Sequence, residues 1–158
     1  MRIISGKLKG KKILLPKDIN TRPLRDLVKE SIFNLINHST KINFQIENSN
    51  VLDLFSGTGS FGIECISRGA NNVTFVENYN DALKILKENI SILGLDKKSK
   101  IIEKNCFDFL DSNNDLNNKY DLIFMDPPYK EKRTDILINT ILEKKILGKD
   151  GIIIGQRI

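Results

Sequence analysis

The stretch Asp53-Leu54-Phe55-Ser56-Gly57-Thr58-Gly59-Ser60-Phe61-Gly62 decides the fold. Its three glycines form the pattern G-x-G-x-x-G between a predicted strand, Val51–Phe55, and a predicted helix, Ser60–Arg68. Glycine lets the chain turn tightly after the strand and lets a ligand approach the backbone closely. Glu77 ends the next predicted strand, 20 residues after Gly57, where a carboxylate can accept hydrogen bonds from ribose hydroxyls. Together these features predict an adenosine-containing ligand at one edge of a sheet.

Strands and helices alternate through the rest of the chain after residue 50. The predicted strands are Val51–Phe55, Val73–Glu77, Lys100–Glu103, Asp121–Met125 and Ile152–Ile154. The predicted helices are Ser60–Arg68, Asp81–Leu93, Phe107–Ser112 and Thr134–Leu147, three of them ended by Gly69, Gly94 and Gly148. This alternation predicts an α/β fold with a parallel sheet covered on both faces, and 158 residues allow one such domain.

A second motif, Asp126-Pro127-Pro128-Tyr129, follows the fourth predicted strand. Two consecutive prolines fix the backbone and hold the residue before them extended, which sets the direction of Asp126. In a doubly wound sheet the first and fourth of these strands are neighbours at the switch point. The glycine loop and this motif are therefore expected to open into one crevice.

The second motif suits transfer of a methyl group to an exocyclic base nitrogen. It therefore favours S-adenosylmethionine over a nicotinamide dinucleotide as the ligand of the glycine loop. The lone pair of such an amine is delocalised into the ring. Acceptors at the Asp126 carboxylate and the Pro127 carbonyl can hold its two protons and stabilise the charge that develops on attack. Tyr129 would stack on the base, which must be unpaired or flipped out.

Positive charge is concentrated at the N-terminus. Residues 1–30 carry nine Lys and Arg against three Asp and Glu, whereas the other 128 residues carry 16 against 17. A basic segment on a nearly neutral body is typical of a surface that contacts phosphates, although a solvated lysine-rich face would look the same. Residues 1–40 are predicted to form a basic RNA-contacting hairpin and helix, and residues 50–158 a catalytic core, in one folded unit.

The N-terminal helix is predicted to begin at Pro23 and to bury one face. Its apolar stripe consists of Leu24, Leu27, Val28, Ser31, Ile32, Leu35 and Ile36, and Arg25, Lys29 and Asn34 are expected on the wet face. The basic residues expected to contact RNA are Arg2, Lys7, Lys9, Lys11, Lys12, Arg22, Arg25 and Lys29.

The two cysteines, Cys65 and Cys106, and the single histidine, His38, predict neither a metal site nor a disulfide framework. Both cysteines are expected to be small buried residues. The longest apolar run has four residues, far short of a membrane span of about 20. We expect a cytoplasmic protein without a signal peptide.

The chain resembles the bacterial 16S rRNA (guanine(966)-N(2))-methyltransferases from residue 1 to about residue 154. The resemblance rests on residues 2–10, Arg22-Pro23, residues 28–34, residues 53–59, Phe75-Val76-Glu77 and residues 126–129. It implies a Rossmann-like class I methyltransferase fold with an N-terminal β-hairpin and S-adenosylmethionine as cofactor. It also implies transfer to the N2 amine of a guanine in 16S rRNA, on a partly assembled small subunit.

The resemblance assigns roles to individual residues. Asp53 and residues 56–59 would hold the methionine end of the cofactor, Glu77 the ribose, and Asn105 with Cys106 the adenine edge, where many relatives have Asp-Ala. The implied cofactor-binding residues are Asp53, Ser56, Gly57, Thr58, Gly59, Gly62, Glu77, Asn78, Asn105 and Cys106. The implied catalytic residues are Asp126, Pro127, Pro128 and Tyr129.

The C-terminus departs from the family pattern, because relatives continue into two further strands after the fifth. The sequence ends in Gly155-Gln156-Arg157-Ile158, so the last strand is expected to be an open edge. We therefore expect self-association through that edge, or marginal stability.

Three other functions stay open on the sequence alone. A DNA adenine-N6 methyltransferase uses a similar Asp-Pro-Pro-Tyr motif, although this chain has no target-recognition domain. A truncated cofactor- or RNA-binding module without catalysis is a second alternative. A dehydrogenase is more distant, because no acid–base pair for hydride transfer is visible.

Overall fold

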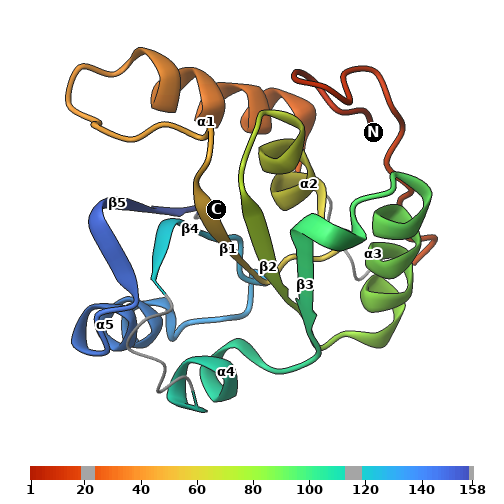
Figure 1. Cartoon of the computed structure of the whole chain (residues 1–158). Coiled ribbons are helices and arrows are strands. Elements are labelled where there is room, and N and C mark those ends of the chain that lie inside the picture. Colours follow the sequence, from red (N-terminus) through yellow and green to blue (C-terminus); the bar gives the residue numbers. More distant parts are fainter. Residues whose placement is uncertain (19–23, 113–118, 157–158) are drawn as a thin grey trace.

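The computed structural model describes residues 1–18, 24–112 and 119–156 (Figure 1). Five strands form one parallel sheet in the order β3-β2-β1-β4-β5. The strands are β1 (Asn50–Leu54), β2 (Asn72–Val76), β3 (Ser99–Ile102), β4 (Tyr120–Met125) and β5 (Leu147–Gly155). The helices are α1 (Asp26–His38), α2 (Ser60–Ser67), α3 (Asn80–Ile92), α4 (Cys106–Ser112) and α5 (Thr134–Glu143), with a 3-10 turn at Asp96–Lys98. The predicted α/β class is confirmed, and β1 lies between β2 and β4 at the switch point.

Each face of the sheet has its own hydrophobic core. On one face α1, α2 and α3 pack with the N-terminal segment, and α4 and α5 cover the other (Figure 1). The rings of Phe33, Phe61 and Phe124 stack through the first core, with centroid separations of 5.2 and 3.8 Å. This stack ties α1 and α2 to β4 beside the switch point. Within the described ranges, no helix is long and apolar enough to cross a bilayer.

The prediction for the last helix and strand is wrong in its boundaries. Helix α5 ends at Glu143, four residues before the expected end, and Lys145 turns the chain with a φ of 54°. Gly148 does not end the helix but lies inside β5, which begins at Leu147. Strand β5 is therefore longer than the apolar run Ile152–Ile154 on which the prediction rests. The pairing of β5 with β4 is irregular between Tyr120 and Leu122.

The N-terminal hairpin is present as a tight turn with a single antiparallel bridge, Arg2 to Lys12, instead of two regular strands. Ile3 and Ile13 are buried in the first core. Glu64 of α2 accepts the backbone N–H groups of Ile4 (2.9 Å) and of Ser5 (3.0 Å). The hairpin is therefore packed against α2. The division into a basic appendage of residues 1–40 and a core of residues 50–158, within one folded unit, stays a prediction.

The predicted apolar stripe of the N-terminal helix is only partly confirmed: Leu24 and Ile36 are buried, and Val28 and Ile32 pack against the core. Leu27 and Leu35 are 75% and 57% exposed, whereas Phe33 is fully buried. Lys29 is also fully buried, 3.4 Å from Glu64, and donates to the backbone oxygen of Arg2 and the hydroxyl of Ser60, each at 3.2 Å. The prediction that Lys29 faces solvent and RNA is therefore wrong. A buried lysine is stable here because its charge is matched by a carboxylate 35 positions further along the chain.

Candidate active site

The glycine loop begins with a strained residue at the end of β1. Phe55 has a φ of 57°, an uncommon conformation for a bulky side chain and one that clusters at functional sites. The turn lets Ser56 donate its N–H to the carbonyl of Val76 at 3.1 Å, and Gly59 donate to Ser56 at 2.9 Å. The loop is therefore fixed to the end of β2 before α2 begins.

The three glycines of the motif have different surroundings. A Cβ on Gly57, whose φ is +56°, would meet no heavy atom of the described residues within 4 Å. A Cβ on Gly59 would lie 2.5 Å from Leu86, and one on Gly62 would lie 2.3 Å from Phe75. Gly57 therefore leaves backbone open to a ligand, whereas Gly59 allows the close approach of Leu86 of α3 and Gly62 allows close packing of α2 on β2. Cofactor contact by these two glycines stays a prediction.

Glu77 is joined directly to the glycine loop. Its carboxylate accepts the N–H groups of Gly57 at 2.8 Å and of Asn78 and Tyr79 at 2.9 Å each. Two carboxylate oxygens offer about four acceptor sites, so three backbone donors leave capacity for a further donor such as a ribose hydroxyl. The arrangement fits the predicted ribose ligand.

The glycine loop and the Asp-Pro-Pro-Tyr motif meet at one small hollow of about 50 Å³. The predicted site residues that line it are Asp53, Ser56, Gly57, Thr58 and Asp126. Small-molecule sites usually measure about 300–1,000 Å³. The hollow is therefore too small to enclose a whole nucleoside-type cofactor, and cofactor binding by its lining residues stays a prediction.

Carboxylates dominate the charge around this hollow. Burial raises the pKa of Asp53 well above its ordinary value. The hydrogen bond that Asp53 accepts from the Gly62 N–H at 3.1 Å lowers this pKa, whereas the nearby charges of Asp126 and Glu77 raise it further. Such a cluster favours a cationic ligand, because a positive charge relieves the repulsion between the carboxylates. A sulfonium with an α-amino group has this character, so the donor set fits S-adenosylmethionine.

Replacing Asp53 with asparagine should change how stability depends on pH. The raised pKa means that the folded state holds this proton more tightly than the unfolded chain does. The contribution of Asp53 to stability therefore falls as pH rises from about the ordinary 3.8 until the buried acid ionises. We expect the difference in melting temperature between Asp53→Asn and the wild type, measured by circular dichroism, to shift in favour of the variant as pH rises from 4 to 8. An offset between the two proteins that does not vary with pH would contradict this.

The four predicted catalytic residues, Asp126 to Tyr129, become more exposed along the chain. Asp126 and Pro127 are half-buried, and Pro128 is exposed. The Tyr129 side chain is 72% exposed, with the Lys132 ammonium 5.7 Å from its ring centroid. The exposed ring is accessible to an incoming base. The catalytic roles of these four residues stay predictions.

Asn105 and Cys106 lie at the start of α4, and neither is among the described residues that line the hollow. The Asn105 side-chain oxygen accepts the Phe107 N–H at 2.8 Å and so caps the helix. Both cysteines are buried, as predicted, and burial raises the pKa of the Cys106 thiol to about 12. The adenine contact stays a prediction for both residues, and Asn78 is exposed beside Glu77.

Four apolar residues of the hollow were not predicted as site residues: Leu24, Phe55, Phe61 and Phe124. Phe55 and Phe61 lie inside the glycine stretch of residues 53–62, so their position in that motif indicates that they are close to the site. Leu24 comes from the segment before α1, and no local pattern indicates that it reaches the sheet edge.

The exposed basic surface agrees only partly with the residues predicted to contact RNA. Those described as exposed are Arg2, Lys7, Lys9, Lys11, Lys12 and Arg25. Lys29 is buried, as noted above, and Arg22 lies outside the described residues. RNA contact by the exposed six stays a prediction.

Comparison with known proteins identifies the family. The model of the family described as "Conserved hypothetical protein 95" matches residues 1–157. The chain belongs to this family. It is 35% identical over 99% of its length to YlbH of Bacillus subtilis (strain 168), a protein provisionally named an rRNA methyltransferase, of which it covers 82%. It is 36% identical over 96% of its length to the Buchnera aphidicola protein named "Ribosomal RNA small subunit methyltransferase D", of which it covers 74%.

Solved structures of methyltransferases share the fold of this family member. An Escherichia coli protein, yhhF, provisionally named a methyltransferase, superposes with a TM-score of 0.78 at 26% identity, covering 94% of this chain and 75% of that one. The protein SMU.776, likewise provisionally named and solved in complex with SAH, gives a TM-score of 0.64 at 27% identity, covering 80% of this chain and 34% of that one. The resemblance to the 16S rRNA methyltransferase family and the predicted class I methyltransferase fold are therefore confirmed.

Proposed function

We propose that this protein is an S-adenosylmethionine-dependent enzyme that methylates the exocyclic N2 amine of a guanine in 16S rRNA. The hollow shared by the glycine loop and Asp126 carries the proposal, because it brings a cofactor-type loop beside a base-binding motif. The names of the family relatives supply the substrate class, since one is a small-subunit rRNA methyltransferase. SAH in the SMU.776 complex supports the cofactor.

In this proposal the chain's own residues bind and activate the amine. S-adenosylmethionine supplies an electrophilic methyl group on a sulfonium sulfur. The Asp126 carboxylate and the Pro127 carbonyl accept the two amine protons, while Tyr129 stacks on the guanine. The N–C bond forms as the S–C bond breaks, and the methylated amine then gives a proton to the Asp126 carboxylate. Transition-state charge is thus stabilised by acceptors that are already oriented.

Transfer of tritiated methyl groups tests the proposal. The acceptors are small ribosomal subunits from a strain that lacks its endogenous enzyme and, in parallel, duplex DNA. We expect label in 16S rRNA, recovered as N2-methylguanosine after nuclease digestion. Label in DNA adenine would instead support the DNA methyltransferase. Binding of S-adenosylhomocysteine without any transfer would support a non-catalytic module.

We also propose that the substrate is a partly assembled small subunit, and that the enzyme therefore acts in the cytoplasm, where subunits assemble. A guanine amine is buried once it is paired, so a particle that leaves the target unpaired offers the better substrate. Comparing transfer rates on free 16S rRNA, assembly intermediates and mature subunits tests this. Faster transfer to free rRNA than to any particle would contradict it.

A further proposal concerns association between two copies through β5. Within the described sheet this strand pairs with β4 alone, and its three consecutive isoleucines, Ile152 to Ile154, are only half-buried. An unpaired edge of this kind is a template for a second strand. Sedimentation velocity at micromolar concentration should detect a dimer that Ile153→Lys weakens. A monodisperse wild-type monomer would contradict the proposal.

A further inference from the structure

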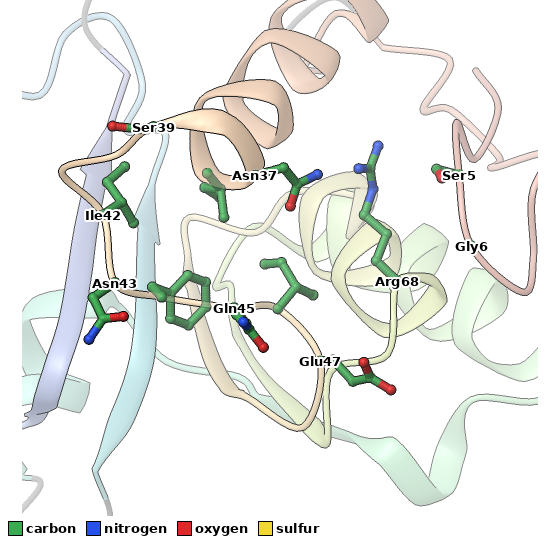
Figure 2. Close-up of a pocket in the computed structure, with 12 residues that line it drawn as sticks. Ser5, Gly6, Asn37, Ser39, Ile42, Asn43, Gln45, Glu47 and Arg68 are labelled. Carbon is green, nitrogen blue, oxygen red and sulfur yellow. The ribbon is translucent and has the colours of Figure 1, made fainter.

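A second and larger depression lies away from the candidate active site, between the end of α1, the segment of residues 39–47 and the end of α2 (Figure 2). Its volume is about 540 Å³, within the range of small-molecule sites. We call it the α1–α2 groove. Its lining combines four apolar residues with polar side chains, three of which are amides: Asn37, Asn43 and Gln45.

The walls of the α1–α2 groove are fixed by the core. Phe44 and Ile46 are buried, so the segment between them cannot lift away easily. The Arg68 side chain, 14% exposed, is held by Glu64 at 3.0 Å and by the ring of Phe33, whose centroid lies 4.1 Å from the guanidinium carbon. Figure 2 shows Arg68 and Asn37 among the lining residues, together with Ser5 and Gly6 of the hairpin. The groove therefore offers hydrogen-bonding groups on a rigid frame.

Helix α2 connects this groove to the candidate active site. Ser60 at its start lines the hollow, and Arg68, which follows its last residue, lines the groove. At 1.5 Å per residue, the eight residues of α2 span about 12 Å. That distance is short enough for one RNA strand of a few nucleotides to reach both places.

The basic hairpin runs along the same helix. Near the start of α2 the Lys29 ammonium donates to the backbone oxygen of Arg2, and near its end Lys7 donates its N–H to the carbonyl of Ser67 at 2.8 Å. Lys7, Lys9 and Lys11 are exposed along this path, and Ser5 and Gly6 line the groove just before the first of them. Phosphates of a strand bound to the hairpin would thus pass the mouth of the groove.

We propose that the α1–α2 groove binds an unpaired base of the same rRNA strand, a few nucleotides from the target guanine. The proposal rests on the proposed function. Unpaired bases are recognised by hydrogen bonds to their edges and by stacking, and amide side chains offer both donors and acceptors. The groove lining holds one cationic and one anionic side chain, Arg68, which is paired with Glu64, and Glu47, whereas the lysines lie outside it. This division suits a neutral base inside and phosphates outside.

The test replaces two exposed amides of the groove, Asn43→Ala with Gln45→Ala. We expect the KM for small subunits to rise about tenfold through loss of two hydrogen bonds. The kcat at saturating subunits and the affinity for S-adenosylhomocysteine should stay unchanged. The control is Asn139→Ala, an exposed amide on α5 across the sheet, which should leave the KM unchanged. An unchanged KM in the double variant would overturn the proposal.

Crosslinking identifies the occupant directly. A photoreactive amino acid in place of Gln45 should crosslink to an unpaired nucleotide of 16S rRNA near the methylated guanine. A crosslink confined to a ribosomal protein would overturn the RNA proposal and make the groove a protein-binding surface. Failure of the proposed function is a separate result, because the wild type would then methylate no small subunits at all.

Discussion

Replacement of Asp126 with alanine is expected to lower the rate of methyl transfer by about 100-fold or more. Asp126 lines the hollow at the end of β4, and its proposed partner is the amine of the substrate. Removing one oriented group that stabilises transition-state charge typically costs about 100- to 1,000-fold in kcat. The affinity for S-adenosylhomocysteine should stay nearly unchanged, because this product carries no reacting amine. Single-turnover transfer of tritium measures the first quantity and calorimetry the second.

Asp111→Ala is a suitable control for this variant, since Asp111 is an exposed carboxylate on α4. It should leave the rate and the cofactor affinity unchanged. Equal losses of rate and cofactor affinity in Asp126→Ala would show that Asp126 holds the cofactor, and would contradict the proposed role. Full activity of Asp126→Ala would remove Asp126 from the mechanism.

Replacement of Glu64 with alanine is expected to destabilise the protein by about 3–5 kcal/mol. This carboxylate is fully buried and faces both Lys29 and Arg68, so its removal leaves a buried ammonium without a counter-charge. It also leaves the N–H groups of Ile4 and Ser5 without their acceptor. Urea unfolding followed by circular dichroism measures the free energy of unfolding.

Two further variants make this result specific. Glu88→Ala removes an exposed carboxylate of α3 and should change the free energy of unfolding by less than about 0.5 kcal/mol. The double variant Glu64→Ala, Lys29→Met should lose less than the sum of the two single losses, because the buried charge is removed with its partner. Strict additivity would show that the pair is not coupled.

Local patterns were sufficient for most of the fold. The glycine stretch predicts the turn between β1 and α2, and the periodicity of the segments predicts the succession of all five strands along the chain. The predicted end of the last helix is wrong, because Gly148 does not stop the helix. The turn actually comes at Lys145, and Gly148 is tolerated inside β5.

The remaining errors concern contacts between segments far apart in sequence. A lysine in a basic segment gives no local sign of burial, and the partner that buries Lys29 belongs to a different helix. The hollow was predictable because two motifs at neighbouring strand ends must meet. The α1–α2 groove was not, since it is formed by the hairpin, the end of α1, the segment before β1 and the end of α2.

A crystal structure of the protein with S-adenosylhomocysteine tests the central claim most directly. That claim is that the glycine loop and Asp126 share one reaction site. The account predicts the sulfur of the ligand at the hollow lined by Asp53, Gly57 and Asp126, with the ribose hydroxyls hydrogen-bonded to Glu77. A ligand bound elsewhere, or one whose sulfur points away from Asp126, would contradict the account.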